Sequence, residues 1–289
     1  MDKKLLLQLR KATFAGILEC KNALKENNND IEKSISWLRQ KGIIKAASKA
    51  NRKSNEGVVA IELTKDKKKA SVIEINSETD FVARNSDFQQ FAKKLAQISI
   101  MYSSKEEFMN AKFNENFNVS EALINYTSVF GEKIILSKLK QISIKDGLLG
   151  KYIHNKIVDN IGSIISVVAI HSDIEVDEIQ SLANDLSVHV ASSNPQYLNE
   201  QLIPYEIIKK EEEIHKKSID SKNKPDNIIK KIIKNKLDKF KDSICLIKQQ
   251  YALDDSYTIE EIIEKTKVSY NSKSLKIVDF IRLKVGELD

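Results

Sequence analysis

The sequence has little of what supports redox, metal or phosphate-loop chemistry: two cysteines, three prolines and eight glycines among 289 residues. Cys20 and Cys245 lie far apart and form no Cys-x-x-Cys pair, which argues against a disulfide framework and a thiolate metal site. We interpret both as buried, small apolar residues. The glycines form neither of the common phosphate-binding motifs, GxxxxGK[ST] and GxGxxG, so the sequence shows no nucleotide cradle.

Long hydrophobic runs are also absent. No apolar stretch approaches the roughly 20 residues of a membrane span, and the start, Met-Asp-Lys-Lys, lacks the apolar centre of a signal peptide. We therefore expect a cytoplasmic protein with no membrane association. A hydrophobic content of 41% is sufficient for a core divided among two or more domains.

The residues of enzyme active sites are present but scattered. The four histidines form neither an HExxH motif nor a tight His/Cys cluster: His154, His171, His189 and His215. No serine lies in a GxSxG-like turn, and Cys20 lies on the apolar face of a small predicted helix. The sequence therefore predicts no catalytic residues, no metal ligands and no cofactor. A hydrolase or transferase built from scattered Asp, Glu and His stays an alternative.

The net charge of +6 and the pI near 8.9 favour an acidic partner or nucleic acid. Acidic residues are interspersed with the basic ones, however, so no phosphate-tracking stripe with stacking aromatic residues is evident. A basic ribosome- or RNA-binding protein is therefore one candidate function. We expect no direct contact with nucleic acid.

The N-terminal stretch has the spacing of three short amphipathic helices. Their apolar faces carry Leu5, Leu6 and Leu9, then Ile17, Cys20 and Leu24, then Ile31, Ile35 and Leu38. Asn29 followed by Glu32 predicts a capping-box start of the third helix, and Gly42 its end. The run from Lys45 to Lys53 predicts one more short helix leading into a linker near Ser54.

From Gly57 the apolar period changes from helical to alternating, which predicts two strands that form a hairpin, followed by a helix containing Phe88, Phe91 and Leu95. A further strand over 134–144 would extend this sheet. The same strand, strand, helix order recurs at 150–153, 161–169 and from Ile179. A duplicated α+β unit is one explanation and chance similarity is the other.

Two strongly charged helices are predicted next, over 205–220 and 226–240, joined by residues 221–225. The apolar stripe of the second helix is wide for one thin partner: Ile228, Ile229, Ile232, Ile233 and Leu237. Either part of this stripe faces another chain, or the stripe packs against the core of the same chain. The sequence pattern does not distinguish these two arrangements. Alternation over 278–285 predicts a final strand that closes the second sheet.

Residues 79–82, Thr-Asp-Phe-Val, place an acid beside a large aromatic residue in the loop between a strand and an amphipathic helix. Either Phe81 packs under its own helix while Thr79 or Asp80 caps it, or Phe81 is exposed as a knob for a partner. The residues alone leave both interpretations open.

These residues lie within EINSETDFVAR at 74–84, which resembles the signature of the elongation factor Ts family at every position. The stretch LRKATFAGILECKNAL at 9–24 is similar to a second signature, with Phe14 in place of a usual glycine and Ile17-Leu18 in place of a frequent methionine pair. Further resemblance is seen in VHVASSNP at 188–195 and FIRLKVG at 280–286, so it spans nearly the whole chain.

The resemblance implies an α+β protein: an N-terminal three-helix, ubiquitin-associated-like domain, then a core of two related α+β subdomains with antiparallel sheets and an inserted helical hairpin. The implied division is a helical domain and linker at 1–53, core subdomain N at 54–145, core subdomain C at 146–193 and 242–289, and the hairpin at 194–241. The sequence stops at Asp289, soon after Val285-Gly286, where many relatives continue into another helix, so we expect that module and its contact to be absent.

The family's function is guanine nucleotide exchange on the GTPase elongation factor Tu. The resemblance implies that Thr79, Asp80, Phe81 and Val82 enter the GTPase near its Mg²⁺ and phosphate site, with Phe81 wedged between two helices. Further partner contacts are implied for the N-terminal domain and the second subdomain, at Ile17, Leu18, His154, Ala252 and Leu253. The segment from His154 to Gly162 is longer than the family's usual hairpin. Some relatives self-associate through the helical hairpin, so a homodimer through it is left open.

Overall fold

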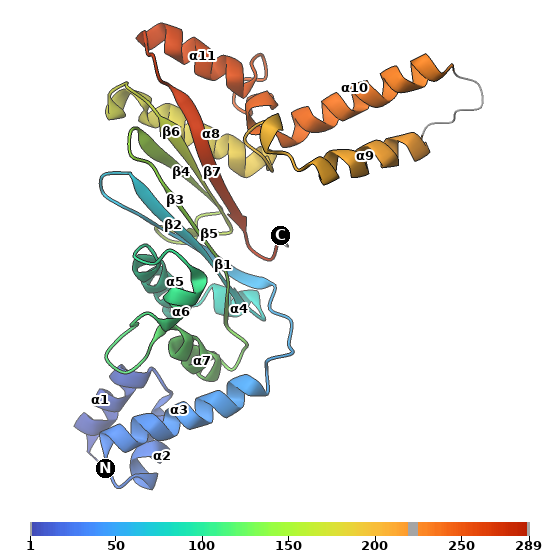
Figure 1. Cartoon of the computed structure of the whole chain (residues 1–289). Coiled ribbons are helices and arrows are strands. Elements are labelled where there is room, and N and C mark those ends of the chain that lie inside the picture. Colours follow the sequence, from blue (N-terminus) through green and yellow to red (C-terminus); the bar gives the residue numbers. More distant parts are fainter. Residues whose placement is uncertain (1, 219–224, 288–289) are drawn as a thin grey trace.

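The computed structural model describes residues 2–218 and 225–287. Helices cover the outer faces of two antiparallel sheets, a helical unit caps one end of the molecule, and a helical hairpin projects from the other end (Figure 1). This arrangement confirms the predicted α+β class. Within the described part of the chain, no helix combines the length and apolarity needed to span a membrane.

The N-terminal unit consists of the three predicted helices, α1 (Lys3–Thr13), α2 (Ile17–Glu26) and α3 (Ile31–Ala47). The predicted cap of α3 is wrong by one residue, because Asn29 has a left-handed backbone with φ 63° while the Asp30 side chain accepts the Lys33 amide at 3.0 Å. The predicted stop at Gly42 is also wrong. The helix continues through Gly42, which is buried where α3 packs against α7, and the run after Ala47 forms turns instead of another helix.

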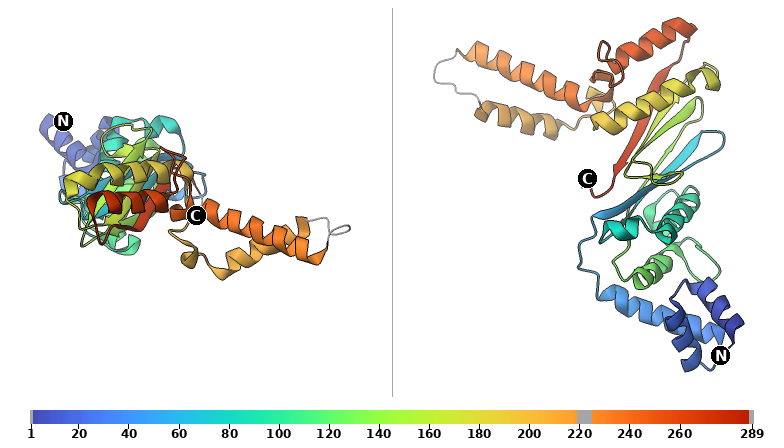
Figure 2. Two further views of the ribbon diagram at one scale, coloured as in Figure 1. Left: turned by 90° about the horizontal axis from the view of Figure 1, so that it is seen from above. Right: turned by 180° about the vertical axis from the view of Figure 1, so that it is seen from behind.

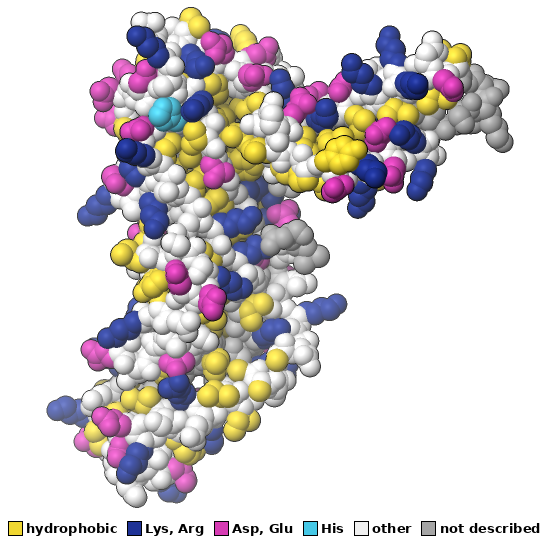
Figure 3. Space-filling model, viewed as in Figure 1, with side chains coloured by type: hydrophobic (Ala, Val, Ile, Leu, Met, Phe, Trp, Pro, Cys, Tyr) yellow, Lys and Arg dark blue, Asp and Glu magenta, His cyan; other side chains and the backbone are white. Residues whose placement is uncertain are grey.

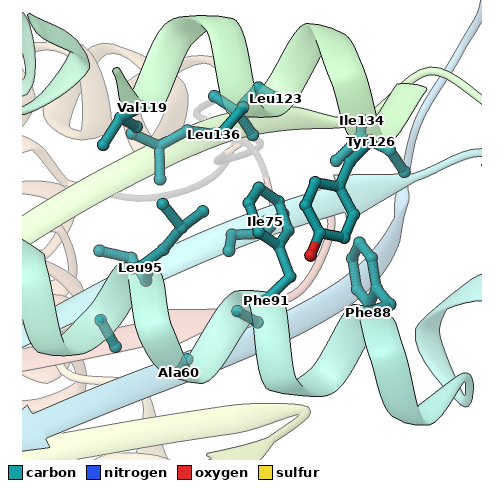
Figure 4. Packing of buried hydrophobic residues seen from close by; sticks show 14 of the residues in the cluster. Ala60, Ile75, Phe88, Phe91, Leu95, Val119, Leu123, Tyr126, Ile134 and Leu136 are labelled. Atoms are coloured by element: carbon teal, nitrogen blue, oxygen red, sulfur yellow. The ribbon is translucent and has the colours of Figure 1, made fainter. Parts of the chain in front are cut away.

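The first sheet has the order β3-β2-β1-β5 and every neighbouring pair is antiparallel. Its strands are β1 (Glu56–Leu63), β2 (Lys69–Ser77), β3 (Ile135–Ser143) and β5 (Ile161–Gly162). Its outer face is covered by α4 (Asp80–Ala83), α5 (Ser86–Ser99), α6 (Lys105–Asn110) and α7 (Val119–Phe130). Figure 4 shows this core, in which the Phe91 ring from α5 stacks on the Tyr126 ring from α7 with centroids 3.8 Å apart.

The second sheet repeats the order of the three long strands of the first, β1, β2 and β3. Its strands β4 (Leu148–His154), β6 (Ile164–His171) and β7 (Lys276–Lys284) have the order β4-β6-β7, and α8 (Val176–Ser193) and α11 (Ile259–Tyr270) cover its outer face. In both sheets the second strand is central, and helical structure follows it directly. The shared topology favours duplication, and β7 closes the second sheet as predicted.

The strand predicted over 161–169 is divided between the two sheets. Ile161 and Gly162 pair with β1, whereas β6 starts at Ile164 and pairs with β4. Gly162 permits this crossing, because a Cβ atom there would lie 2.5 Å from Ile153 Cγ2. The two sheets pack face to face through a third cluster, which includes Val59, Val72, Ile165 and Val167.

The projecting hairpin consists of α9 (Tyr205–Ser218) and α10 (Asp226–Ile244), flanked by 3₁₀ turns at Glu200–Leu202 and Leu246–Lys248 (Figure 2). Its base is anchored by Ile203, Ile244 and Cys245, and Cys20 is likewise buried, as predicted for both cysteines. Along the predicted stripe of α10, Ile233 is buried and Ile228 is exposed. The predicted joint lies outside the described residues except for Pro225.

Candidate functional site

Consecutive apolar residues of the short helix α4 differ sharply in their exposure to solvent. Phe81 is 81% exposed, whereas Val82 and Ala83 are buried in the core beneath the first sheet's helices. Gln89 donates to the Ala83 carbonyl at 3.2 Å and so ties α4 to α5. Of the two interpretations of Phe81, the structure therefore supports the exposed one. Val82 anchors the turn and Phe81 extends from it.

The segment before α4 is held by a carboxylate from a distant part of the chain. Glu132 accepts the Thr79 amide at 3.0 Å and the Thr79 hydroxyl at 2.7 Å. Glu132 directly follows Gly131, which ends α7 with a left-handed φ of 70°. Ser77 also donates to the Thr79 carbonyl at 2.9 Å. Thr79 is thus the N-cap residue by position, but its side chain points to Glu132 and makes no capping bond with α4.

A second carboxylate extends this support to the N-terminal linker. Glu78 accepts the Lys133 amide at 2.7 Å and pairs with the Arg52 guanidinium at 3.2 Å. Although burial raises the pKa of the Glu78 carboxyl, the Lys133 amide and the Arg52 guanidinium outweigh it and hold that pKa below its ordinary value. The Lys133 ammonium in turn donates to the carbonyls of Ala50 and Arg52 at 2.5 and 3.0 Å. We call Arg52, Glu78, Glu132 and Lys133 the knob platform.

Asp80 and Phe81 together form the outward part of this element, which we call the knob. The Asp80 side chain is about half exposed and forms an ion pair with Arg84 at 3.1 Å, one helical turn later. A surface pair of this kind is weak and exchangeable. The knob therefore offers a rigid apolar group beside an acid whose present partner is replaceable.

The other predicted contact residues lie on separate elements. Ile17 and Leu18 are 57% and 69% exposed at the start of α2, where Glu19 pairs with Lys45 of α3. His154 is exposed at the end of β4, with its Nδ1 atom 3.3 Å from the Tyr152 hydroxyl. Ala252 and Leu253 are exposed in the loop before α11. The structure brings these residues into no single cluster with the knob.

The loop that carries Ala252 and Leu253 is held by a buried histidine. The His189 Nδ1 atom accepts the Ala252 amide at 3.1 Å, and its Nε2 atom lies 2.9 Å from Gln249 Oε1. This pair of partners requires the neutral tautomer with the proton on Nε2. Burial lowers the pKa of His189, although the hydrogen bond to Gln249 opposes it.

The lowered pKa of His189 predicts a loss of stability in mild acid. The unfolded chain binds a proton near the ordinary pKa of 6.5, whereas the folded imidazole resists it. The stabilisation of the fold by the neutral His189 side chain is therefore complete above the ordinary pKa, and it falls as the pH decreases through and below that value. We expect the midpoint of urea unfolding to decrease between neutral pH and about pH 5, where unperturbed histidines are charged.

Two matched variants distinguish the contribution of His189 to this pH dependence from the contributions of the other titrating groups. His189→Gln removes the group, so the decrease should become smaller, while His171→Gln, at the end of β6, should retain the full decrease. An unchanged decrease in His189→Gln would contradict this assignment. Urea titrations followed by circular dichroism at the two pH values supply the measurement.

Within residues 2–218 and 225–287, no group of three or more His, Cys, Asp or Glu side chains is placed to hold a metal ion. Sequence reasoning missed the two residues that position the predicted contacts, Glu132 and His189. Glu132 is separated from Thr79 by 53 positions, and no local motif connects them. His189 forms part of no metal-binding or catalytic motif, although it lies in one of the stretches that carry the family resemblance.

Comparisons with known proteins match most of the amino-acid sequence. A family model described as Elongation factor TS matches residues 78–287. The chain is 36% identical over 282 residues to Elongation factor Ts of Ehrlichia ruminantium (strain Gardel), covering 97% of each chain. It is 33% identical over 285 residues to Elongation factor Ts of Orientia tsutsugamushi (strain Boryong), covering 98% of this chain and 91% of the relative. It is 34% identical over 280 residues to Elongation factor Ts of Rhodopseudomonas palustris (strain BisA53), covering 97% and 90%.

Proposed function

Because this chain belongs to the elongation factor Ts family of translation elongation factors, we propose that it is the guanine nucleotide exchange factor of elongation factor Tu. It acts in the cytoplasm in protein biosynthesis. It binds the GDP-loaded GTPase, dislodges Mg²⁺ and releases GDP so that GTP can bind. The chain makes or breaks no covalent bond in this activity and is therefore not an enzyme in the usual sense.

The observation that carries the proposal is the exposure of Phe81 on a rigidly supported turn. An isolated Phe at 81% exposure leaves a large apolar surface in water, which has no benefit for the free protein. Such side chains dominate binding when they enter a pocket of a partner. The knob platform and the buried Val82 hold the turn in place, so little conformational entropy is lost when it docks.

Exchange then follows from electrostatics and linkage. Mg²⁺ in a GTPase bridges phosphate oxygens and protein oxygens, so its displacement removes much of the charge stabilisation that retains GDP. In this proposal Phe81 separates elements of the GTPase and Asp80 brings a negative charge near the metal site. A factor that binds the empty GTPase more tightly than the GDP-loaded one must weaken GDP by the same free energy.

We further propose that the remaining exposed residues extend the contact with elongation factor Tu. Ile17 and Leu18 serve the N-terminal domain, and His154, Ala252 and Leu253 serve the second subdomain. In the proposed division into a helical domain (1–53), subdomain N (54–145), hairpin (194–241) and subdomain C (146–193 with 242–289), these contacts and the knob involve every part except the hairpin. On the face shown in Figure 3, basic and acidic side chains are interspersed, which favours a protein partner over RNA.

The reciprocity of linkage supplies the test of this proposal. Calorimetric titrations should give tighter binding to nucleotide-free elongation factor Tu than to the GDP-loaded form. Equal affinities, together with strongly salt-dependent binding to RNA, would reject exchange and support the ribosome- or RNA-binding alternative.

A further inference from the structure

Helix α7 contacts the N-terminal unit along its length and ends beside the knob platform. It packs against α3 (Figure 1), where a Cβ atom at Gly42 would lie 3.8 Å from Ser128 Cβ. Ile35 of α3 packs against both the core of the N-terminal unit and the core that contains α7. Glu132, the second residue after α7, accepts two hydrogen bonds from Thr79. One helix therefore contacts the N-terminal unit and supports the knob.

Three side-chain contacts reinforce this packing: a hydrogen bond, an ion pair and a contact between two rings. They are made by Asn125 with the Thr13 carbonyl, by Arg39 with Glu121, and by Phe14 with Tyr126. We call these three contacts the latch. Asn125 is buried, and Glu121 lies one turn before it on α7. A rotation of the N-terminal unit about any one of these contacts would break the others, so the latch fixes its orientation.

Phe14 makes its contact from an unfavourable backbone conformation. Its φ is 59°, in the left-handed region that bulky side chains rarely occupy. The Phe14 ring is 43% exposed and lies 5.6 Å from the Tyr126 ring, measured between centroids. Tyr126 is itself fixed, because it stacks on Phe91 in the core. Such strain persists where surrounding contacts impose it, and here those contacts cross from the N-terminal unit to α7.

We propose that the latch joins the N-terminal unit and the knob into one rigid body, so that Ile17, Leu18 and Phe81 reach elongation factor Tu in a fixed relative position. When one contact has formed on a rigid body, the second forms at a high effective concentration and loses little further freedom. The linker provides another connection, because Arg52 pairs with Glu78 of the knob platform. The latch residues are thus positioning residues. Their effect on binding rests on the proposed function, whereas the rigid docking does not.

Distances between two spin labels test the rigid docking in the full-length protein. Lys21→Cys on α2 and Lys93→Cys on α5 provide exposed labelling sites on the two sides of the latch. The natural cysteines, Cys20 and Cys245, are buried and do not compete for the label. We expect a single narrow distribution of distances by pulsed electron paramagnetic resonance. A broad distribution would overturn the proposal, because the N-terminal unit would then move freely.

Two latch substitutions should broaden this distribution when they are combined. Phe14→Asn removes the ring, and asparagine tolerates the left-handed backbone, so the end of α1 should be retained. Asn125→Ala removes the donor to the Thr13 carbonyl. Ile44→Ala is the matched control, because Ile44 is 70% exposed on α3 and its truncation should leave the distances unchanged. A distribution in the combined latch variant as narrow as in its parent would also overturn the proposal.

Exchange kinetics test the consequence for the partner. The combined variant, Phe14→Asn/Asn125→Ala, should raise the KM for GDP-loaded elongation factor Tu about fivefold or more, as the effective concentration of the second contact falls. Its kcat should be unchanged, because Glu132 still holds the knob. In a background of Ile17→Ala/Leu18→Ala, the same latch substitutions should raise KM little further.

A merely structural role of the latch would give a different pattern. The latch substitutions would then lower kcat, or would raise KM by the same factor in both backgrounds, and either result would contradict positioning. If the unmodified protein does not accelerate GDP release at all, the proposed function fails and the predicted effect on KM fails with it. The spin-label distances still decide whether the N-terminal unit and the knob form one rigid body.

Discussion

Phe81→Ala should slow catalysed GDP release by roughly 30-fold or more, the effect of losing an interfacial hot spot of 2 kcal/mol. The side chain is 81% exposed and its neighbour Val82 carries the packing of the turn, so the fold should be retained. We expect the free energy of unfolding to change by no more than about 0.5 kcal/mol, as for other exposed positions. Stopped-flow release of a fluorescent GDP analogue gives the rate, and urea unfolding gives the stability.

Met101→Ala is the matched control for this variant. Met101 is 76% exposed on the same subdomain, so its truncation removes a similar apolar surface away from the knob. Exchange should be unaffected in this protein. If GDP release with Phe81→Ala equals that of the wild type, Phe81 is not the wedge and the mechanism given above is wrong.

Glu132→Ala should slow exchange by about tenfold without any change in the knob residues themselves. The variant removes both acceptors of Thr79 and leaves its amide without a partner. Hydrogen bonds to charged acceptors contribute about 1.5 to 3 kcal/mol each, which is enough to reduce the population of the positioned knob tenfold. Glu132→Gln keeps one acceptor, so its exchange rate should lie between those of the wild type and Glu132→Ala. Glu106→Ala, at an exposed position of α6, serves as the control.

A double-mutant cycle distinguishes a positioning role for Glu132 from a direct contact with the partner. If Glu132 acts only through the knob, the Phe81→Ala/Glu132→Ala protein should exchange no more slowly than Phe81→Ala alone. Additive losses would contradict the positioning role and would indicate that Glu132 touches the GTPase. The same release assay measures all four proteins.

The parts of the fold that sequence periodicity predicts are those whose burial is local. The amphipathic helices and the strands of both sheets follow from residues such as Phe88, Phe91 and Val59, whose spacing reports directly on one buried face. The order of elements, including the last strand β7, was therefore predictable. Gly42 was misjudged because its role depends on the approach of α7, a contact that local pattern does not contain.

The candidate site was only half predictable for the same reason. Motif similarity identified Thr79 to Val82, but local physics could not decide whether Phe81 is buried or exposed. The deciding interactions come from Glu132 and Lys133, more than 50 positions away, and from the burial of Val82. The crossing of β5 to the first sheet likewise depends on how closely Gly162 approaches Ile153, which only the packed structure specifies.

The central claim is tested most directly by release of a fluorescent GDP analogue from purified elongation factor Tu in the presence of excess unlabelled GDP. Catalytic amounts of this protein should accelerate release, with each molecule acting on many GTPase molecules. An unchanged rate with a folded sample would contradict the assignment of nucleotide exchange to this chain.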